Sequence, residues 1–263
     1  MSTGGFTGAF PGGMHSSPAC PGDKWSLVVP FKGGPSAKSR LQGDEGTETI
    51  PSALRRQLAL GFLADTVAAA AAAANVGRII IISSDPAAVI NAPKVLMLQD
   101  SGHGLNAAID AGFIYARSLS STDPVAAVTA DLPRLTTAEL EDALQSARHQ
   151  SLAIVPDRDG SGTTMITALP GVHVSPLFGP GSRDAHTRAG HRLLPIPGDS
   201  TLRMDVDTVE DLVAAVQEGV GEHTRAALLA SGIFPPHPLF GGHSFHSCPS
   251  EIVTEKRKPC PAF

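Results

Sequence analysis

Cysteine is scarce in this chain and confined to its ends. Among the 263 residues there are three cysteines, Cys20, Cys248 and Cys260, and none of them lies in the patterned middle of the sequence. This placement argues against a disulfide framework and fits a protein kept in the reducing cytoplasm. We therefore expect the fold to rest on an apolar core, for which a hydrophobic content of 42% is sufficient.

Other absences exclude further classes of protein. The sequence contains no apolar run long enough to span a bilayer. Its first residues lack the charged segment followed by an apolar segment that is typical of a secretory signal. A formal net charge of −5 argues against a broad nucleic-acid-binding surface. We therefore expect neither a membrane nor a nucleic acid among the partners.

The two ends of the chain differ in composition from its middle. Residues 1–23 are rich in Gly, Pro, Ser and Thr, and residues 233–263 carry repeated Pro with scattered His and Cys. Neither end has a periodic apolar pattern, so we predict disordered tails at 1–23 and 233–263 around one domain at 24–232. A structural metal in the second tail is the alternative, but its His and Cys lack the paired spacing of a zinc module.

Strand-like and helix-like segments alternate along the middle of the chain. Such alternation predicts an α/β fold, a three-layer α/β/α sandwich with a mostly parallel sheet. In these sheets, ligands bind at the carboxyl ends of the strands. The predicted strands are Ser26–Pro30, Arg78–Ser83, Lys94–Leu98, Val125–Ala130, Leu152–Val155, Thr163–Leu169, His191–Ile196 and Arg203–Val206. The predicted helices are Pro51–Ala74, Leu105–Leu119, Thr136–Gln150, Thr208–Glu218 and His223–Ala230.

A cationic loop follows the first predicted strand. The segment Trp25–Leu41 reads WSLVVPFKGGPSAKSRL, an apolar run that leads through a glycine-containing turn to Lys38 and Arg40. Glycines let a backbone approach a ligand closely, and Lys and Arg neutralise a polyphosphate. The GxxxxGK[ST] spacing of a P-loop is absent. The alternative is an ordinary strand exit with solvated charges.

Three aspartates are placed where they could bind a metal ion. Asp131 directly follows the apolar run VAAVTA, and Asp205 and Asp207 lie in RMDVDT ahead of a predicted helix. Side chains at i and i+2 of an extended segment point to the same side, so Asp205 and Asp207 could meet one ion. Hard oxygen ligands near phosphates suit Mg²⁺. The alternatives are a turn residue at Asp131 and a carboxylate at a helix N-terminus at Asp207.

Six motifs occur in an order that resembles one enzyme family. They are VVPFKGGPSAKSRL, SGHGLNAAI, ADLPRL, DRDGSGTT, FGPGSRDAH and RMDVDT, all between residues 25 and 232. Together they resemble the guanylyltransferases of coenzyme F-420 biosynthesis, whose acceptor is 2-phospho-L-lactate in archaea and phosphoenolpyruvate in actinobacteria. The resemblance implies a Rossmann-like nucleotidyltransferase fold of the GT-A-like type. It also implies GTP and phosphoenolpyruvate, or a related phospho-acid, as substrates.

The resemblance implies roles at the nucleotide end of the site. Lys38 and Arg40 would bind the GTP triphosphate and stabilise charge as pyrophosphate leaves. Gly102, Leu105 and Asn106 belong to the stretch that would approach the base and the ribose, just ahead of a helix.

The resemblance implies a second set of roles at the acceptor end. Thr163, Gly179 and Ser182 would hold the acceptor phosphate, which agrees with the anion affinity of glycine turns and helix starts. Gly160–Gly162 forming only a hairpin turn is the alternative. The metal, Mg²⁺, would be bound by Asp131, Asp205 and Asp207. Transfer to a phosphate needs no histidine, so His186 and His191 are expected at the surface or in packing.

Two other functions stay open at this point. The chain could be a nucleotidyltransferase that uses a sugar phosphate or molybdopterin as acceptor. It could also be a nucleotide-binding protein without turnover, although the intact aspartates argue against that. Among phospho-acids, phosphoenolpyruvate, 2-phospho-L-lactate and 3-phospho-D-glycerate differ by few atoms, and the sequence does not separate them.

Overall fold

A computed structural model describes residues 24–33, 38, 41 and 50–232 of the chain. Both predicted tails lie outside these residues, and so do Arg40 and the greater part of the cationic loop. The tails and the limits of the predicted domain therefore stay predictions.

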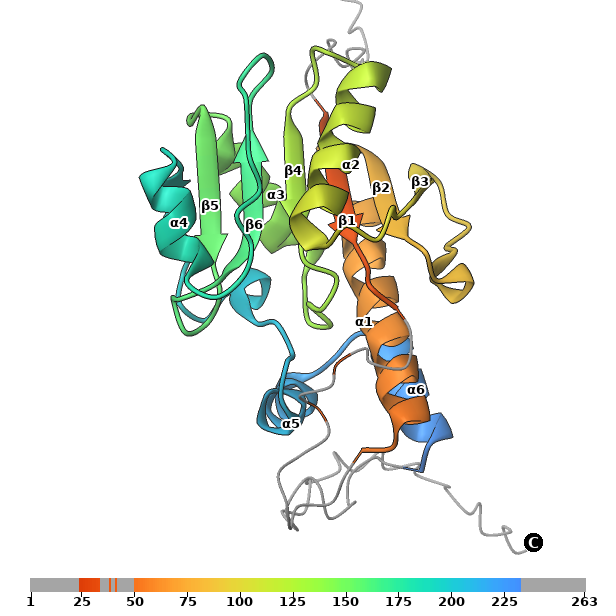
Figure 1. Ribbon diagram of the computed structural model, residues 1–263. Coiled ribbons are helices and arrows are strands. Elements are labelled where there is room, and N and C mark those ends of the chain that lie inside the picture. The colour runs from red at the N-terminus through yellow and green to blue at the C-terminus, as the bar shows by residue number, and fades with distance from the viewer. Residues whose placement is uncertain (1–23, 34–37, 39–40, 42–49, 233–263) are drawn as a thin grey trace, which may run out of the picture.

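A seven-stranded sheet forms the centre of the fold (Figure 1). The strand order is β3-β2-β1-β4-β6-β5-β7, and β6 alone runs against the others, because it pairs antiparallel with both β4 and β5. All other pairs are parallel, which confirms the prediction of a mostly parallel sheet. The strands are β1 (Trp25–Pro30), β2 (Val76–Ser83), β3 (Val95–Gln99), β4 (Val125–Val128), β5 (Leu152–Pro156), β6 (Thr163–Ala168) and β7 (Arg192–Leu193).

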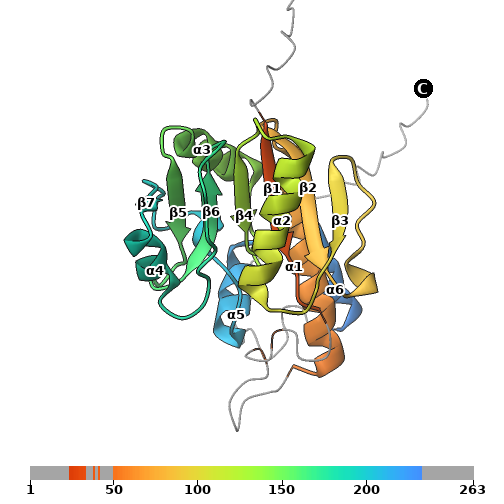
Figure 2. The same ribbon diagram turned by 45° about the horizontal axis from the view of Figure 1, so that its top comes forward.

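Helices cover both faces of this sheet (Figure 2). On one face, α1 (Ser52–Ala72) and α3 (Thr137–Ala147) enclose a core that contains Leu27 and Val29 of β1. On the other face, α2 (Leu105–Leu119) packs Phe113 against Val28. Alternate residues of β1 thus enter two different cores, as expected for a strand that is buried on both sides. None of the helices described here is long and apolar enough to cross a lipid bilayer.

A third apolar cluster lies beyond the carboxyl ends of the strands. The first half of α1 extends past the sheet, and α5 (Val209–Glu218) and α6 (Glu222–Ala230) lie beside it (Figure 1). Phe62 of α1, Leu212 of α5 and Leu228 of α6 are buried in this cluster. Gly61 permits the close approach of α6, because a Cβ there would lie 3.1 Å from Thr224 Cα. The cluster supports the segment that carries Asp205 and Asp207.

Two predicted strands are wrong in part or in full. At His191–Ile196, β7 includes Arg192–Leu193 alone. At Arg203–Val206 the chain ends a short 3-10 helix, η3 (Thr201–Arg203), and then continues without regular secondary structure. A single backbone bond holds this segment to β4's end, from Val206 N to the Asp131 carbonyl at 3.0 Å. The two remaining short elements are η2 (Pro86–Ala88) and α4 (Ser182–Arg188).

Candidate active site

A cavity of about 870 Å³ opens at the carboxyl ends of the parallel strands. Its wall is formed by the ends of β1, β4 and β5, the start of β6, the first turn of α4 and the segment 205–207. This is where sheets of this kind bind ligands. Eight of the predicted site residues line the cavity: Lys38, Leu105, Asp131, Thr163, Gly179, Ser182, Asp205 and Asp207.

The other three predicted residues are placed differently. Gly102 lies in an exposed turn before α2, and Arg40 lies outside the described residues. Asn106 uses its side-chain amide on the backbone of Phe178, donating to the carbonyl at 3.0 Å and accepting from the N–H at 2.8 Å. Asn106 therefore fixes the loop before α4, and its contribution to the cavity is through that loop.

Lys38 lies between two of the predicted metal ligands. Its Nζ donates to Asp131 Oδ2 at 2.5 Å and to Asp207 Oδ1 at 2.7 Å, and its side chain is only 14% exposed. Burial lowers the pKa of Lys38, but the two carboxylates more than offset this and leave its pKa raised. The lysine is therefore charged at neutral pH. In this structure it neutralises carboxylates, whereas the resemblance implies a triphosphate as its partner.

The carboxylates outnumber the cation that they share. Asp131 keeps its second oxygen, Oδ1, buried and without a hydrogen-bond partner among the described residues. Burial, together with the charges of Asp131, Asp207 and Asp157, raises the pKa of Asp205 to about 7. In the part of the chain that the structure describes, no three ligand side chains are already gathered around one point. The donor set is therefore rich in hard oxygen and short of positive charge, as a divalent cation would require.

The loop that carries Asp131 is held from behind by two helices. Thr66 of α1 bonds both backbone groups of Leu132 through its hydroxyl, at 3.3 Å each. At the start of α6, Gly221 N donates to the Pro133 carbonyl at 2.8 Å. Helices α1 and α6 lie behind this loop, away from the cavity, and their hydrogen bonds to Leu132 and Pro133 fix the position of Asp131.

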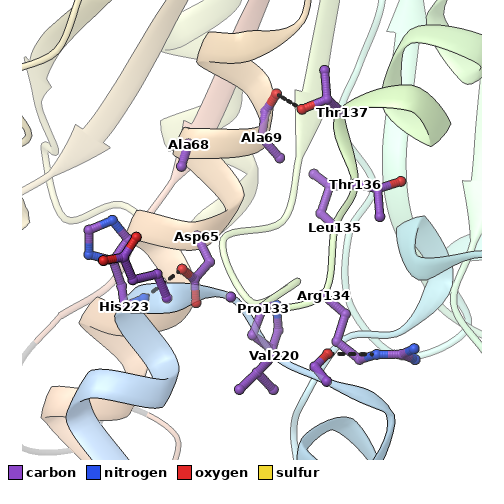
Figure 3. Close-up of a pocket in the computed structure, with 13 residues that line it drawn as sticks. Asp65, Ala68, Ala69, Pro133, Arg134, Leu135, Thr136, Thr137, Val220 and His223 are labelled. Atoms are coloured by element: carbon purple, nitrogen blue, oxygen red, sulfur yellow. Dashed lines mark hydrogen bonds between the residues drawn. The ribbon is translucent and has the colours of Figure 1, made fainter. Parts of the chain in front are cut away.

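A second hollow of about 470 Å³ lies behind this loop (Figure 3). Asp65 of α1 points into it and accepts the backbone N–H groups of His223 and Thr224, at 2.9 Å each, so it caps α6. On the opposite side, Arg134 Nε donates to the Gly219 carbonyl at 3.2 Å. Asp65 thus fastens α6 to α1, and Arg134 fastens the end of α5 to the loop that carries Asp131.

The start of the cationic loop is also fixed. A Cβ at Gly33 would clash with the carboxylate of Asp85, so this position needs glycine. Asp85 is held in turn by Arg56, whose Nη2 lies 2.8 Å from Asp85 Oδ1, and by the N–H of Ala87 at 2.9 Å. The direction in which the chain leaves β1 is therefore set by Asp85 in the loop that follows β2.

The end of the cavity that is predicted to hold the acceptor contains buried hydroxyl groups. Ser182 Oγ donates to Thr163 Oγ1 at 3.1 Å, and His186 Nδ1 lies 3.2 Å from the same Thr163 oxygen. Thr163 starts β6 and Ser182 starts α4, so the pair joins the sheet to that helix. Gly179 and Gly181 have positive φ angles, +134° and +69°, which bend the loop into the first turn of α4.

Comparison with known proteins identifies the family. The family described as "Guanylyl transferase CofC like" matches residues 25–234. The chain belongs to this family. It is 42% identical over 211 residues to a phosphoenolpyruvate guanylyltransferase of Streptomyces scabiei, covering 78% of this chain and 95% of the relative. A protein of the same name from Thermomonospora curvata is 42% identical over 215 residues, covering 81% and 92%.

A solved structure supports the fold assignment. It comes from Desulfovibrio desulfuricans G20 and is described as that of a nucleotide-diphospho-sugar transferase. The TM-score is 0.58 at 18% identity, with 79% of this chain and 95% of the other chain covered. The predicted nucleotidyltransferase fold and the predicted family are therefore both confirmed, and the protein is a nucleotidyltransferase.

Two residues of the site were missed by the sequence reasoning. Asp157 lines the cavity at the end of β5 and accepts the N–H groups of Ser161 at 3.0 Å and Gly162 at 2.7 Å. The rule that singled out Asp131 at a strand end applies equally to Asp157 in DRDGSG. His186 is fully buried against Thr163, and the only signal for it in the sequence is its spacing of four residues after Ser182, which would put both residues on one face of a helix.

Proposed function

We propose that this protein transfers GMP from GTP to a small phosphorylated carboxylic acid in coenzyme F-420 biosynthesis, with phosphoenolpyruvate as the acceptor. The products would be enolpyruvoyl-2-diphospho-5′-guanosine and pyrophosphate. Family membership and the names of relatives at 42% identity support the chemistry. One observation carries the proposal: a single cavity joins a lysine–carboxylate cluster to a pair of buried hydroxyl groups. We place the reaction in the cytoplasm on the cysteine pattern.

The reaction joins two anions, so charge and position are the problems to solve. An oxygen of the acceptor phosphate attacks the α-phosphorus of GTP, and a new P–O bond forms. The bond from the α-phosphorus to its bridging oxygen breaks, and pyrophosphate leaves with that electron pair. The attacking oxygen is already ionised, so no general base is needed. The protein must therefore align the two substrates and neutralise their charge.

Asp131, Asp205 and Asp207 would hold the divalent cation, for which we propose Mg²⁺. When bound, this ion would neutralise charge on the phosphate oxygens as pyrophosphate departs. Two observations support a cation at these residues. Asp131 has a buried oxygen without a partner among the described residues, and the pKa of Asp205 is raised by burial and by neighbouring carboxylates, so a nearby positive charge would stabilise both groups. If the ion bound to Asp131 and Asp207, Lys38 would lose at least one of its two hydrogen bonds to these carboxylates. We propose that it then turns to the triphosphate, where Arg40 would join it.

The two substrates would occupy different walls of the cavity. Leu105, at the start of α2, would contact the nucleotide, with Gly102 and Asn106 shaping the turn and loop around it. Gly179, Thr163 and Ser182 would form the wall that holds the phosphate of the acceptor, with Thr163 donating to the phosphate and Ser182 supporting Thr163. In this assignment, the nucleotide wall binds a group whose charge changes as pyrophosphate leaves. The acceptor wall binds a phosphate that is an anion throughout.

Mass spectrometry of the products tests this proposal. The full-length protein is incubated with GTP, Mg²⁺ and, in separate reactions, phosphoenolpyruvate, 2-phospho-L-lactate, 3-phospho-D-glycerate or a sugar phosphate. The expected result is a guanylylated product and pyrophosphate, most abundant with phosphoenolpyruvate. Products with a sugar phosphate alone would indicate the broader nucleotidyltransferase class, and GTP binding without pyrophosphate release would indicate a protein without turnover. Either result would contradict the proposal.

A further inference from the structure

One histidine that the reaction does not use is held in a single tautomer beside the acceptor wall. His186 Nε2 lies 2.9 Å from the backbone nitrogen of Leu177, and a backbone N–H can only donate. Nε2 must therefore carry the lone pair, and the ring proton must reside on Nδ1. Burial and, to a lesser extent, the neighbouring His191 lower the pKa of His186 to about 4, against a smaller opposing effect of a backbone contact with Ser182. The ring is therefore neutral at working pH.

This tautomer decides the direction of the hydrogen bond to Thr163. Nδ1–H donates to Thr163 Oγ1 across 3.2 Å, and Ser182 Oγ–H donates to the same oxygen across 3.1 Å. A hydroxyl oxygen has two lone pairs and one proton. Both lone pairs of Thr163 are thereby used, and its proton has no acceptor among the described residues. Since Thr163 lines the cavity, that proton is available to a ligand there.

We propose that His186 is a positioning residue that makes the Thr163 hydroxyl an obligatory donor to the acceptor substrate. The inference rests on the proposed function, since it requires an anion at this wall. A group that only accepts hydrogen bonds, such as an ionised phosphate, satisfies the arrangement. A ligand N–H or O–H group that must donate a hydrogen bond here finds no free lone pair on Thr163 Oγ1, because His186 and Ser182 already donate to it. The wall thus selects for acceptor-only groups without adding a charge of its own.

The surroundings of His186 keep the ring in this orientation. Phe178 meets it edge-on with ring centroids 5.2 Å apart, and His191 does so from another side at 5.1 Å. Asn106 grips the backbone of Phe178 from α2. His191 itself donates from Nδ1 toward the His186 carbonyl at 3.1 Å, and it does not line the cavity. A variant of His191 therefore measures how far ring packing alone affects His186.

Nuclear magnetic resonance tests the tautomer without any need for turnover. The full-length protein is labelled with ¹⁵N in its histidine rings, and the His186 signals are assigned with His186→Asn. The expected result at pH 7 is a protonated Nδ1 and an unprotonated Nε2. Addition of phosphoenolpyruvate without GTP should shift the Nδ1–H signal. The opposite tautomer would overturn the inference, whatever acceptor the enzyme uses.

Steady-state kinetics on matched variants tests the link to Thr163. His186→Gln loses the donor at the Nδ1 position, and we expect about a tenfold rise in the acceptor's KM with kcat and the KM for GTP near wild type. His186→Asn restores an N–H near that position and should recover most of the loss. His191→Asn removes a ring contact but leaves the donor to Thr163 in place, so it should raise the acceptor's KM less than His186→Gln does.

A double-mutant cycle separates positioning from simple support of the fold. In a Thr163→Val background, His186→Gln should cause no further rise in the acceptor's KM, because the group through which it acts is gone. A full, multiplicative rise would overturn the inference, and so would equal losses in His186→Gln and His186→Asn. If no phospho-acid supports turnover at all, the proposed function fails, while the tautomer result still decides this inference.

Discussion

The two ends of the cavity differ in how completely their polar atoms are satisfied. At the acceptor end, Thr163, Ser182 and His186 bond one another and the backbone, and all are buried. At the other end, one lysine serves two carboxylates, and an oxygen of Asp131 is left without a partner in the described residues. The difference teaches that one wall is held together by its own hydrogen bonds, whereas the other has more carboxylate groups than the lysine alone can neutralise.

The largest expected effect lies at the charged end. Asp131→Asn and Asp207→Asn should each lower kcat by about 10²- to 10³-fold, because each removes a proposed ligand of the ion that stabilises the transition state. Steady-state rates of pyrophosphate release measure this. Asp110→Asn, at an exposed position on α2, is the matched control and should leave kcat unchanged. Near-normal turnover of either site variant at limiting Mg²⁺ would remove these residues from the metal site.

The next largest effect concerns Thr163. Thr163→Val keeps the shape but removes the donor, so the acceptor's KM should rise about 10- to 100-fold while the KM for GTP changes little. The free energy of unfolding should also fall by about 1–3 kcal/mol, because Ser182 and His186 lose their partner. Thr167→Val on the same strand is the control, since Thr167 Oγ1 is buried without a partner in the described residues. A larger loss of stability in the control would contradict this reading of the strand.

Ser182 should matter less than Thr163. Its hydroxyl proton is directed at Thr163, so Ser182→Ala removes a neutral hydrogen bond, worth about 0.5–1.5 kcal/mol, within the protein. We expect the acceptor's KM to rise by less than about tenfold. An effect greater than that of Thr163→Val would mean that Ser182 itself donates to the substrate. A rise in the KM for GTP alone would mean that the two walls are assigned the wrong way round.

The last expected effect is on stability rather than on turnover, in how the free energy of unfolding depends on pH. The pKa of His186 is lowered from 6.5 to about 4 by burial, so the unfolded chain binds this proton more tightly than the folded one. The contribution of His186 to stability is therefore complete above pH 6.5 and is lost as pH falls toward 4. Urea titrations of wild type and His186→Asn at several pH values measure this. Parallel pH profiles for the two proteins would show that His186 does not titrate as described.

The fold was largely predictable from the sequence, with informative exceptions. Fully apolar runs such as Arg78–Ser83 form strands in which core residues come from both faces, and periodicity detects them well. The reversal of β6 leaves no trace in periodicity, because a buried strand reads alike in either direction. Arg203–Val206 alternates like a strand, but its partners are the Asp131 and Asp157 carbonyls at the strand ends. Only the tertiary structure reveals that.

The location of the site could be predicted from the sequence, but the hydrogen-bond partners within it could not. The strand-end rule and the family motifs brought eight predicted residues to one cavity. The lysine bridge between Asp131 and Asp207 could not be predicted, since it joins residues 93 and 169 positions away from Lys38. His186 was expected at the surface or in packing because the chemistry needs no proton transfer. Its hydrogen bonds to Leu177 and Thr163 depend on how α4 packs against β6.

We propose that Lys38 occupies the place that a divalent cation would take between Asp131 and Asp207 at the charged end of the cavity. Binding of Mn²⁺ alone, followed by electron paramagnetic resonance on the full-length protein without nucleotide, tests it directly. Lys38→Gln removes the competing ammonium and should tighten Mn²⁺ binding by about tenfold, which corresponds to about 1.4 kcal/mol. Equal or weaker binding of Mn²⁺ by this variant, with its fold intact by circular dichroism, would contradict the account.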